Sequence, residues 1–219
     1  MQAKAYKGMG MEGPIARWYA KTSRRDLGEF KSLARRMAEG LPEDARVLEV
    51  APGPGYFAIE LAKLGKHHVT GLDISRTFVD LARKNAEKEG VSVDFRQGDA
   101  AHAPFADGSF DLIMCRAAFK NFTEPVMALK EMKRVLKPGG KAVIIDLRRD
   151  TPKEAIDSYI DGIKPGAFNS IIMKLTFRMM LLKRAYTKSE FEKFIAASGF
   201  EQFHIQETAL GFEISLVKI

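Results

Sequence analysis

The sequence predicts an α/β fold in which helices cover both faces of a mostly parallel sheet. Apolar strand patterns alternate with amphipathic helix patterns from residue 46 to residue 147. Such alternation is typical of a parallel sheet, because each crossover between parallel strands takes a helix. Two further strand patterns, residues 200–207 and 212–219, are joined by a short turn. We therefore expect an antiparallel hairpin at one edge of the sheet.

The length and composition fit one globular domain. The chain has 219 residues, of which 46% are hydrophobic and 29% are charged, close to the average of folded domains. The net charge of +7 is spread along the sequence, which favours a generally basic surface over a nucleic-acid site. With Cys115 as the single cysteine, we expect neither an intramolecular disulfide nor a metal site. No secretory signal or membrane span is recognisable, which predicts a cytoplasmic protein.

Helix caps, helix-ending residues and the spacing of apolar residues predict the order of helices and strands. Ser23 is expected to cap a first helix, whose apolar positions run from Leu27 to Met37. The strands of the parallel sheet are expected at residues 46–50, 68–72, 91–96, 110–115 and 142–147. The other helices are expected at residues 56–64, at 76–89 behind a Ser75 cap, from 123 to before Pro138, and at 187–198 behind a capping box of Thr187 and Glu190.

A glycine-rich loop, residues 51–55, follows the first strand and opens a helix. Glycines there let a ligand approach the backbone at the start of the helix. The third glycine of the dinucleotide fingerprint is missing, because Ala58 and Ile59 follow Gly55. The loop therefore need not hold a pyrophosphate.

Two aspartates follow the next two strands. Asp73 stands where an acidic side chain accepts hydrogen bonds from the ribose hydroxyls of an adenosine ligand, and Asp99 follows the third strand in the same way. Each aspartate alone would more often be a loop residue or a helix cap. Together with the glycine loop they mark the carboxyl ends of three strands, where open α/β sheets bind ligands.

These motifs, in their order and spacing, resemble the class I S-adenosylmethionine-dependent methyltransferases, above all the small-molecule branch that includes the ubiquinone and menaquinone C-methyltransferases. The motifs are residues 47–55, 71–75, 98–100, 104–111 and 134–140. The resemblance implies a Rossmann-like, seven-stranded sheet in a single methyltransferase domain. It also implies four parts, namely an N-terminal helical lid (1–45), a cofactor-binding core (46–147), a helical insert (148–186), and a last helix with the hairpin (187–219).

The resemblance further implies S-adenosylmethionine as the cofactor, with S-adenosylhomocysteine as its product. Residues assigned to the methionine half are Glu49, Ala51, Gly53, Gly55, Cys115 and Arg116. Residues assigned to the adenosine half are Asp73 and Ile74 near the ribose, with Asp99 and Ala100 at the adenine. Cys115 would be a small wall residue and not a nucleophile.

The sequence departs from the family pattern at two places. Ala51 replaces the first glycine of the loop, which is tolerable if its φ is negative, since one methyl group is the only added bulk. Residues 118–122 stand where many relatives carry a pair of histidines. That departure argues against an acid-base mechanism that uses histidine.

A methyl group on a sulfonium is already activated, so the main task of the protein is alignment, an effect of up to about 7 to 11 kcal/mol. A general base is not obligatory. Tyr19, Lys120 and His102 are candidates for one, although His102 is expected to be exposed to solvent. We expect Tyr19, Lys120 and Asn121 to line the catalytic site, under an aromatic lid that includes Tyr6 and residues 13–19. The equally weighted alternative is that Trp18 and Tyr19 only seal the helix that precedes the sheet.

The insert of residues 150–185 has several interpretations. Its apolar positions share one helical face, namely Phe168, Ile171, Ile172, Leu175, Met179 and Leu182. Packing onto the domain is favoured, followed by a hydrophobic substrate pocket and by peripheral contact with a membrane. We expect a small-molecule acceptor that can be hydrophobic. A methyltransferase for RNA or protein and a non-catalytic cofactor-binding protein are the alternatives, and both a monomer and a homodimer are open.

Overall fold

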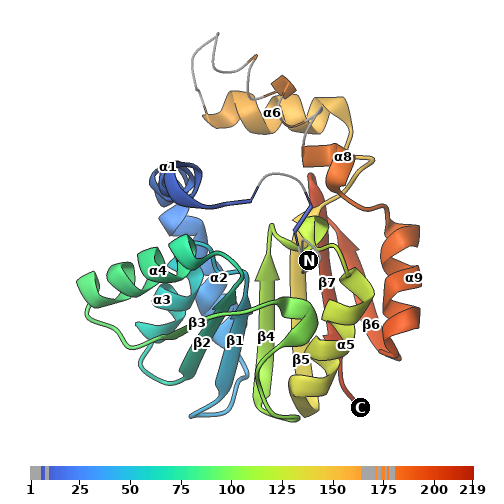
Figure 1. The fold of residues 1–219 in the computed structure, drawn as a ribbon. Coiled ribbons are helices and arrows are strands. Elements are labelled where there is room, and N and C mark those ends of the chain that lie inside the picture. Colours follow the sequence, from blue (N-terminus) through green and yellow to red (C-terminus); the bar gives the residue numbers. More distant parts are fainter. Residues whose placement is uncertain (1–5, 8–9, 164–170, 172–173, 176, 178–180) are drawn as a thin grey trace, which may run out of the picture.

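The structure, a computed structural model, describes residues 6–7, 10–163, 171, 174–175, 177 and 181–219. A seven-stranded sheet runs through its centre in the order β3-β2-β1-β4-β5-β7-β6 (Figure 1). The strands are β1 (Arg46–Val50), β2 (His68–Asp73), β3 (Asp94–Gln97), β4 (Phe110–Arg116), β5 (Leu136–Leu147), β6 (Gln202–Glu207) and β7 (Gly211–Val217). Neighbours are parallel from β3 to β5, whereas β7 runs antiparallel to both β5 and β6. The predicted fold class, including the terminal hairpin, is confirmed.

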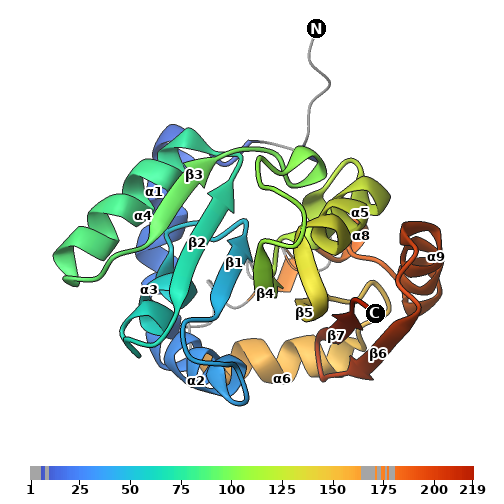
Figure 2. The ribbon, with the colours of Figure 1, turned by 90° about the horizontal axis from the view of Figure 1, so that it is seen from below.

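Helices cover both faces of this sheet, as predicted (Figure 2). They are α2 (Leu27–Ala38), α3 (Tyr56–Ala62), α4 (Arg76–Lys88), α5 (Pro125–Val135) and α9 (Lys188–Ser198). Helices α2, α3 and α4 pack on one face in a core that includes Val47 and Met114. Helices α5 and α9 pack on the other face with Leu48 and Ile113. The two cores alternate along β1 and β4 because successive side chains of a strand point to opposite faces.

The N-terminal part of the chain differs from the prediction. A helix α1 (Gly13–Ser23) precedes the expected one, and the 3-10 helix η1 (Arg24–Asp26) joins it to α2. The expected cap at Ser23 is therefore wrong, because Ser23 ends α1 and its hydroxyl donates to the Tyr19 carbonyl at 2.8 Å. A side-chain cap is not needed for α2, since the backbone is already helical in η1 and Leu27 N–H donates to the Arg24 carbonyl.

Strand β5 begins at Leu136 and not at residue 142. Its register with β4 shifts between Phe110 and Leu112, so Pro138 and the glycines after it fall in an irregular part of the pairing. A missing backbone N–H is tolerated there. Smaller shifts occur where β3 starts at Asp94, α3 ends at Ala62 and α5 starts at Pro125.

The insert contributes helices α6 (Lys153–Ile163) and α8 (Leu182–Arg184). Leu182 packs with Ile156 and Ile160, which confirms the expected packing at that position. Ile171 and Leu175 are instead 66% and 56% exposed, so a single buried face is wrong for them. Phe168, Ile172 and Met179 lie outside the described residues. In the described part of the chain, no helix is long and apolar enough to cross a membrane.

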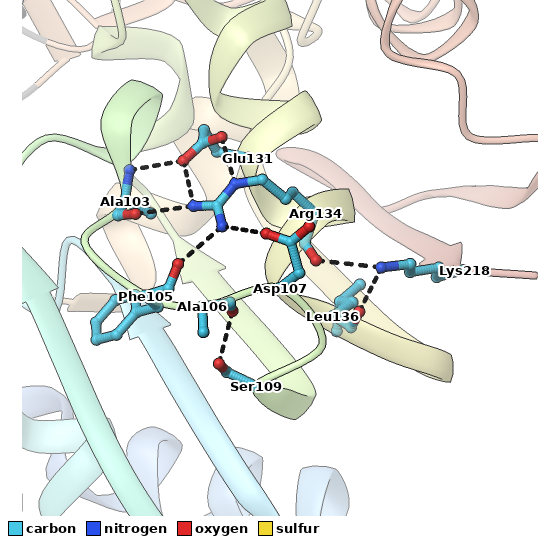
Figure 3. A network of polar contacts seen from close by, with 9 residues as sticks. All are labelled: Ala103, Phe105, Ala106, Asp107, Ser109, Glu131, Arg134, Leu136 and Lys218. Atoms are coloured by element: carbon cyan, nitrogen blue, oxygen red, sulfur yellow. Dashed lines mark hydrogen bonds and ion pairs between the residues drawn. The ribbon is translucent and has the colours of Figure 1, made fainter.

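One polar network explains two of the sequence motifs (Figure 3). The guanidinium of Arg134 in α5 donates to the carbonyls of Ala103 and Phe105 at 2.9 and 2.8 Å, and to the carboxylates of Asp107 and Glu131. These bonds fix the loop between β3 and β4 against α5. The motif at residues 134–140 therefore supplies the donor of this network, Arg134, and the motif at residues 104–111 supplies two of its acceptors, Phe105 and Asp107.

Candidate functional site

The glycine-rich loop turns sharply where β1 ends. Ala51 N–H donates to the Leu72 carbonyl at 2.8 Å, which ties the start of the loop to β2. Ala51 has φ 56°, in the left-handed region. A negative φ, the condition under which the sequence made alanine tolerable here, is therefore not met. A left-handed conformation costs about 1 to 2 kcal/mol in a residue with a Cβ atom.

The two glycines of the loop have different surroundings. A Cβ added at Gly55 would lie 2.7 Å from the Phe95 ring and 2.9 Å from Ala82, so Gly55 is required for close packing of the loop against α4 and β3. A Cβ added at Gly53 would meet only the Tyr19 ring, at the ordinary contact distance of 3.9 Å. Close packing therefore does not require a glycine at this position, although its φ of 55° favours one.

Asp73 joins three strand ends. Its side chain is buried, and its two carboxylate oxygens accept the N–H groups of Gly53 and Ser75, each at 2.9 Å. Its carbonyl accepts Gly98 N–H at 2.9 Å, at the end of β3. Burial raises the pKa of Asp73 to about 6, although its backbone hydrogen bonds act in the opposite direction.

Glu49 is a second buried carboxyl group, one residue before the end of β1. It accepts Ala58 N–H at 3.0 Å, which holds the first turn of α3. Burial, reinforced by the charge of Asp73, raises the pKa of Glu49 to about 8. Two acidic groups that are costly to ionise therefore lie beside the glycine loop, an arrangement that suits a ligand with positive charge.

The other residues assigned to the adenosine half lie at the ends of β2 and β3. Ile74 is 40% exposed although Asp73 before it is buried. Asp99 accepts Ala101 N–H at 3.0 Å and so caps the 3-10 helix η2 (Ala100–His102). The side chain of His102 is 70% exposed, which confirms that this histidine faces solvent.

Cys115 and Arg116 end strand β4. Cys115 is fully buried, and burial raises the pKa of its thiol well above the ordinary value, so it is not a nucleophile at neutral pH. The guanidinium of Arg116 donates to Glu29 at 2.9 Å and lies 4.6 Å from the centre of the Phe30 ring. Arg116 therefore binds α2 to the carboxyl end of the sheet.

Lys120 lies in the 3-10 helix η3 (Phe119–Asn121) and is buried. Its ammonium donates to one oxygen of Asp146 at 2.9 Å, and its backbone N–H donates to the other at 2.8 Å. A side chain engaged in a buried ion pair is poorly placed to accept a proton, so the geometry favours a positioning role. Sequence reasoning missed Asp146. Its position near the carboxyl end of β5, beside the other strand-end acids, was the available signal.

Helix α1 lies over the carboxyl end of the sheet (Figure 1). The hydroxyl of Tyr56 in α3 donates to the Ala20 carbonyl at 2.8 Å. The Tyr19 ring packs edge-on against Phe78 of α4, with ring centres 5.8 Å apart. These contacts place Tyr19, predicted from the sequence as a site residue, next to the glycine loop.

Further contacts fasten the segment before α1 at two places. Near α4, the Ser75 hydroxyl donates to the Met11 carbonyl at 2.7 Å, and the Glu12 carboxylate accepts Arg76 N–H at 2.9 Å. Near η3, Lys7 N–H donates to the Asn121 carbonyl at 2.8 Å. No local pattern in the sequence predicts these anchors, since each joins residues far apart in the chain.

Comparison with known proteins agrees with this geometry. The methyltransferase domain family matches residues 48–144. The demethylmenaquinone methyltransferase of Chlorobaculum parvum is 30% identical over 175 residues, which cover 77% of this chain and 70% of that protein. The chain belongs to the class I S-adenosylmethionine-dependent methyltransferases. A demethylmenaquinone methyltransferase of Deinococcus radiodurans is 42% identical over 102 residues, but this match covers only 46% of the chain and 42% of that protein.

The fold of this methyltransferase also recurs in solved structures. A candidate S-adenosyl-L-methionine-dependent methyltransferase from Methanococcus maripaludis superposes with a TM-score of 0.77 at 21% identity, covering 99% of this chain and 97% of the other. The family match ends at residue 144 and begins at residue 48. Helices α1 and α6, which lie over the carboxyl end of the sheet, are therefore outside the residues that the family model matches (Figure 1).

Proposed function

We propose that this methyltransferase transfers a methyl group from S-adenosylmethionine to a small acceptor held at the carboxyl end of the sheet. The observation that carries the proposal is the glycine loop, uncrowded at Gly53, with the buried carboxyl groups of Glu49 and Asp73 beside it. Membership of the family already implies S-adenosylmethionine as the cofactor.

The residues present fit S-adenosylmethionine. Each oxygen of Asp73 accepts one backbone N–H, and a carboxylate oxygen has a second lone pair that can accept from a ribose hydroxyl. The exposed side chain of Ile74 offers apolar surface to an adenine ring. A cationic ligand near Glu49 favours its ionised form and so offsets the cost of its burial. Asp99 and Ala100 complete the adenosine side.

When bound, the cofactor supplies an activated methyl group on a positively charged sulfur, and S-adenosylhomocysteine remains after transfer. The protein's part is to align the acceptor and to exclude water. Burial raises the pKa of Tyr19, so its phenol is neutral near neutral pH and can donate a hydrogen bond to the acceptor. The proton that the acceptor loses can leave to solvent without a dedicated base.

The acceptor is proposed to be a small aromatic molecule. Its nucleophilic atom would approach the Gly53 loop from the side on which Tyr6, Tyr19 and Asn121 lie. Support comes from the aromatic lining and from the relatives, which are named demethylmenaquinone methyltransferases. Burial also raises the pKa of Tyr6, although the charge of Arg184 acts in the opposite direction, so both phenols are available as hydrogen-bond donors.

Calorimetric titration tests the cofactor assignment. S-adenosylhomocysteine is expected to bind the purified protein, and NAD is not, because the third dinucleotide glycine is missing. Tyr19→Ala should weaken S-adenosylhomocysteine binding several-fold, since its ring faces the loop. Trp18→Ala is the matched control, because Trp18 is 67% exposed and should leave the affinity unchanged. Binding of NAD alone would contradict the proposal.

Transfer of a radiolabelled methyl group tests the acceptor. Hydroquinones and phenols of increasing apolar area are offered as acceptors, and the labelled product is extracted into organic solvent. We expect turnover with at least one member of this set and none with RNA or with a protein lysate depleted of small molecules. The reverse pattern would assign the enzyme to a macromolecular substrate.

A further inference from the structure

The outward face of α1 combines an aromatic side chain with four cations. Trp18, the chain's single tryptophan, is 67% exposed. Arg17, Lys21, Arg24 and Arg25 are also exposed and follow one helical face through α1 and η1. We refer to these five residues as the α1 face. Residues 13–25 contain no Asp or Glu, although Glu12 and Asp26 flank them, so the four cations outnumber the acids of this segment.

The opposite side of α1 is used for packing. Ala16 and Ala20 are buried, and Tyr56 hydrogen-bonds to the Ala20 carbonyl. Tyr19 points toward the Gly53 loop, whereas its neighbour Trp18 points away. Among the residues that the structure describes, no acidic side chain forms an ion pair with a cation of the α1 face. The cations of the α1 face thus have no ion-pair partner among the described residues. The other side of the same helix faces the candidate site.

Exposed aliphatic side chains lie at the same end of the molecule. Ile171 and Leu175 are more than half exposed. Their segment is held on α6, since the Phe177 ring contacts Tyr159 with centres 5.9 Å apart. Helices α1 and α6 both lie over the carboxyl end of the sheet (Figure 1). Charges of Arg25 and Asp26 act on the Tyr159 hydroxyl, which shows that α6 reaches the neighbourhood of η1.

We infer that the α1 face docks on the surface of an anionic lipid bilayer. Its cations match anionic headgroups in charge, and an indole among them suits the boundary between headgroups and acyl chains. The exposed Ile171 and Leu175 favour a lipid surface over a nucleic acid, because aliphatic side chains gain nothing from phosphates or base edges. Docking in this orientation turns the carboxyl end of the sheet toward the bilayer. This orientation would let an apolar acceptor enter the site from the lipid, a step that rests on the proposed function.

Trp18 makes the docking directly measurable. The purified full chain is titrated with vesicles of phosphatidylcholine alone and with vesicles that also contain phosphatidylglycerol, and tryptophan emission is followed. We expect a blue shift with the anionic vesicles only, together with quenching by lipids brominated on the upper part of the acyl chain. Added salt should weaken binding, because the attraction between exposed charges is screened.

Charge variants test whether the α1 face is responsible. Each cation near an anionic surface contributes about fivefold in partitioning, so Arg17→Gln/Lys21→Gln should lower vesicle binding roughly 25-fold. The matched control is Lys66→Gln/Lys141→Gln, which removes the same charge. Lys66 precedes β2 and Lys141 pairs with Leu112 near the start of β4, so both lie away from the carboxyl end. The control should bind vesicles like the wild type.

Cosedimentation of Trp18→Ala with the same vesicles should show weaker binding. Unfolding midpoints and S-adenosylhomocysteine titrations of all variants separate loss of docking from loss of fold or of cofactor binding. Three results would overturn the inference: no binding to either vesicle, equal losses in the two double variants, or binding of a polynucleotide through the α1 face without vesicle binding. The last result would reassign this face to nucleic acid.

Discussion

The carboxylate of Asp73 accepts the N–H of Gly53 at 2.9 Å, so the acid at the end of β2 holds the loop that follows β1. The same side chain also accepts Ser75 N–H at the start of α4. The residue proposed to bind the ribose therefore also fixes the backbone around it. Its replacement must affect both the cofactor and the fold.

Asp73→Asn is expected to weaken S-adenosylhomocysteine binding by roughly 1.5 to 3 kcal/mol, the usual contribution of hydrogen bonds to a charged group. Since an amide has one acceptor oxygen, one of the two backbone N–H groups would face an NH₂ group, and the urea midpoint should fall as well. Calorimetry and urea unfolding measure the two effects. Asp80→Asn, at an exposed position of α4, is the control and should change neither. Wild-type affinity in Asp73→Asn would remove Asp73 from the site.

The raised pKa of Glu49 predicts that the stability of the folded protein depends on pH. This pKa is about 8 in the folded protein, against an ordinary 4.5. Between these pH values the folded protein holds a proton that the unfolded chain has lost, so the free energy of unfolding falls as pH rises. Glu49→Gln removes this contribution, and its Tm should fall less than that of the wild type across the same window.

The exposed Glu39 supplies the control for this measurement. Glu39→Gln should follow the wild-type curve of Tm against pH. Parallel curves for Glu49→Gln and the wild type would show that Glu49 ionises at its ordinary pKa. Asp73, whose pKa is raised to about 6, is present in all three proteins and cancels in the comparison.

Ala51→Gly is expected to stabilise the protein by up to about 1 kcal/mol. It relieves a left-handed conformation that costs a residue with a Cβ atom about 1 to 2 kcal/mol, and this gain exceeds the entropy cost of glycine, about 0.5 to 1 kcal/mol. Urea unfolding measures the change. Ala45→Gly is the control, because Ala45 is not among the described residues with positive φ and should lose stability. A loss of equal size in both variants would show that φ at Ala51 is not strained.

Lys120 and Asp146 should be strongly coupled in stability. Breaking a buried ion pair costs about 3 to 5 kcal/mol, so Lys120→Met should destabilise the fold strongly. In a double-mutant cycle with Asp146→Asn, the double variant should lose much less than the sum of the two single losses. The half-exposed pair Lys63 and Glu60 provides a reference coupling below about 1 kcal/mol. A coupling for Lys120 and Asp146 no larger than the reference would contradict a structural ion pair.

Local signals were sufficient to predict most of the fold. Ser75 accepts the N–H of Phe78 and Thr187 forms a capping box with Glu190, because caps depend on residues within one turn. The placement of Asp73 and Gly53 at one sheet edge followed from the alternation of strands and helices, which brings the carboxyl ends of parallel strands together.

Features that depend on distant residues could not be predicted in this way. The ion pair of Lys120 joins η3 to β5, and the contact of Glu12 with Arg76 joins the segment before α1 to α4. The cap predicted at Ser23 was wrong because a helix, α1, already occupies the residues before it. The spacing of hydrophobic residues in that segment did not indicate this helix. The positive φ of Ala51 is set by its hydrogen bond to β2 and not by its residue type.

The position of β7 between β5 and β6 has a consequence for synthesis on the ribosome. Neither β6 nor β5 can complete its pairing until residues 211–217 have emerged, because β7 is the hydrogen-bonding partner of both. Until then β5 presents an open edge, and open edges of parallel sheets are prone to aggregate. At Gly211 a Cβ would lie 1.9 Å from the Asp146 carbonyl oxygen. A side chain there would block this late insertion, so nascent chains carrying Gly211→Val should be retained by chaperones instead of being released as folded protein.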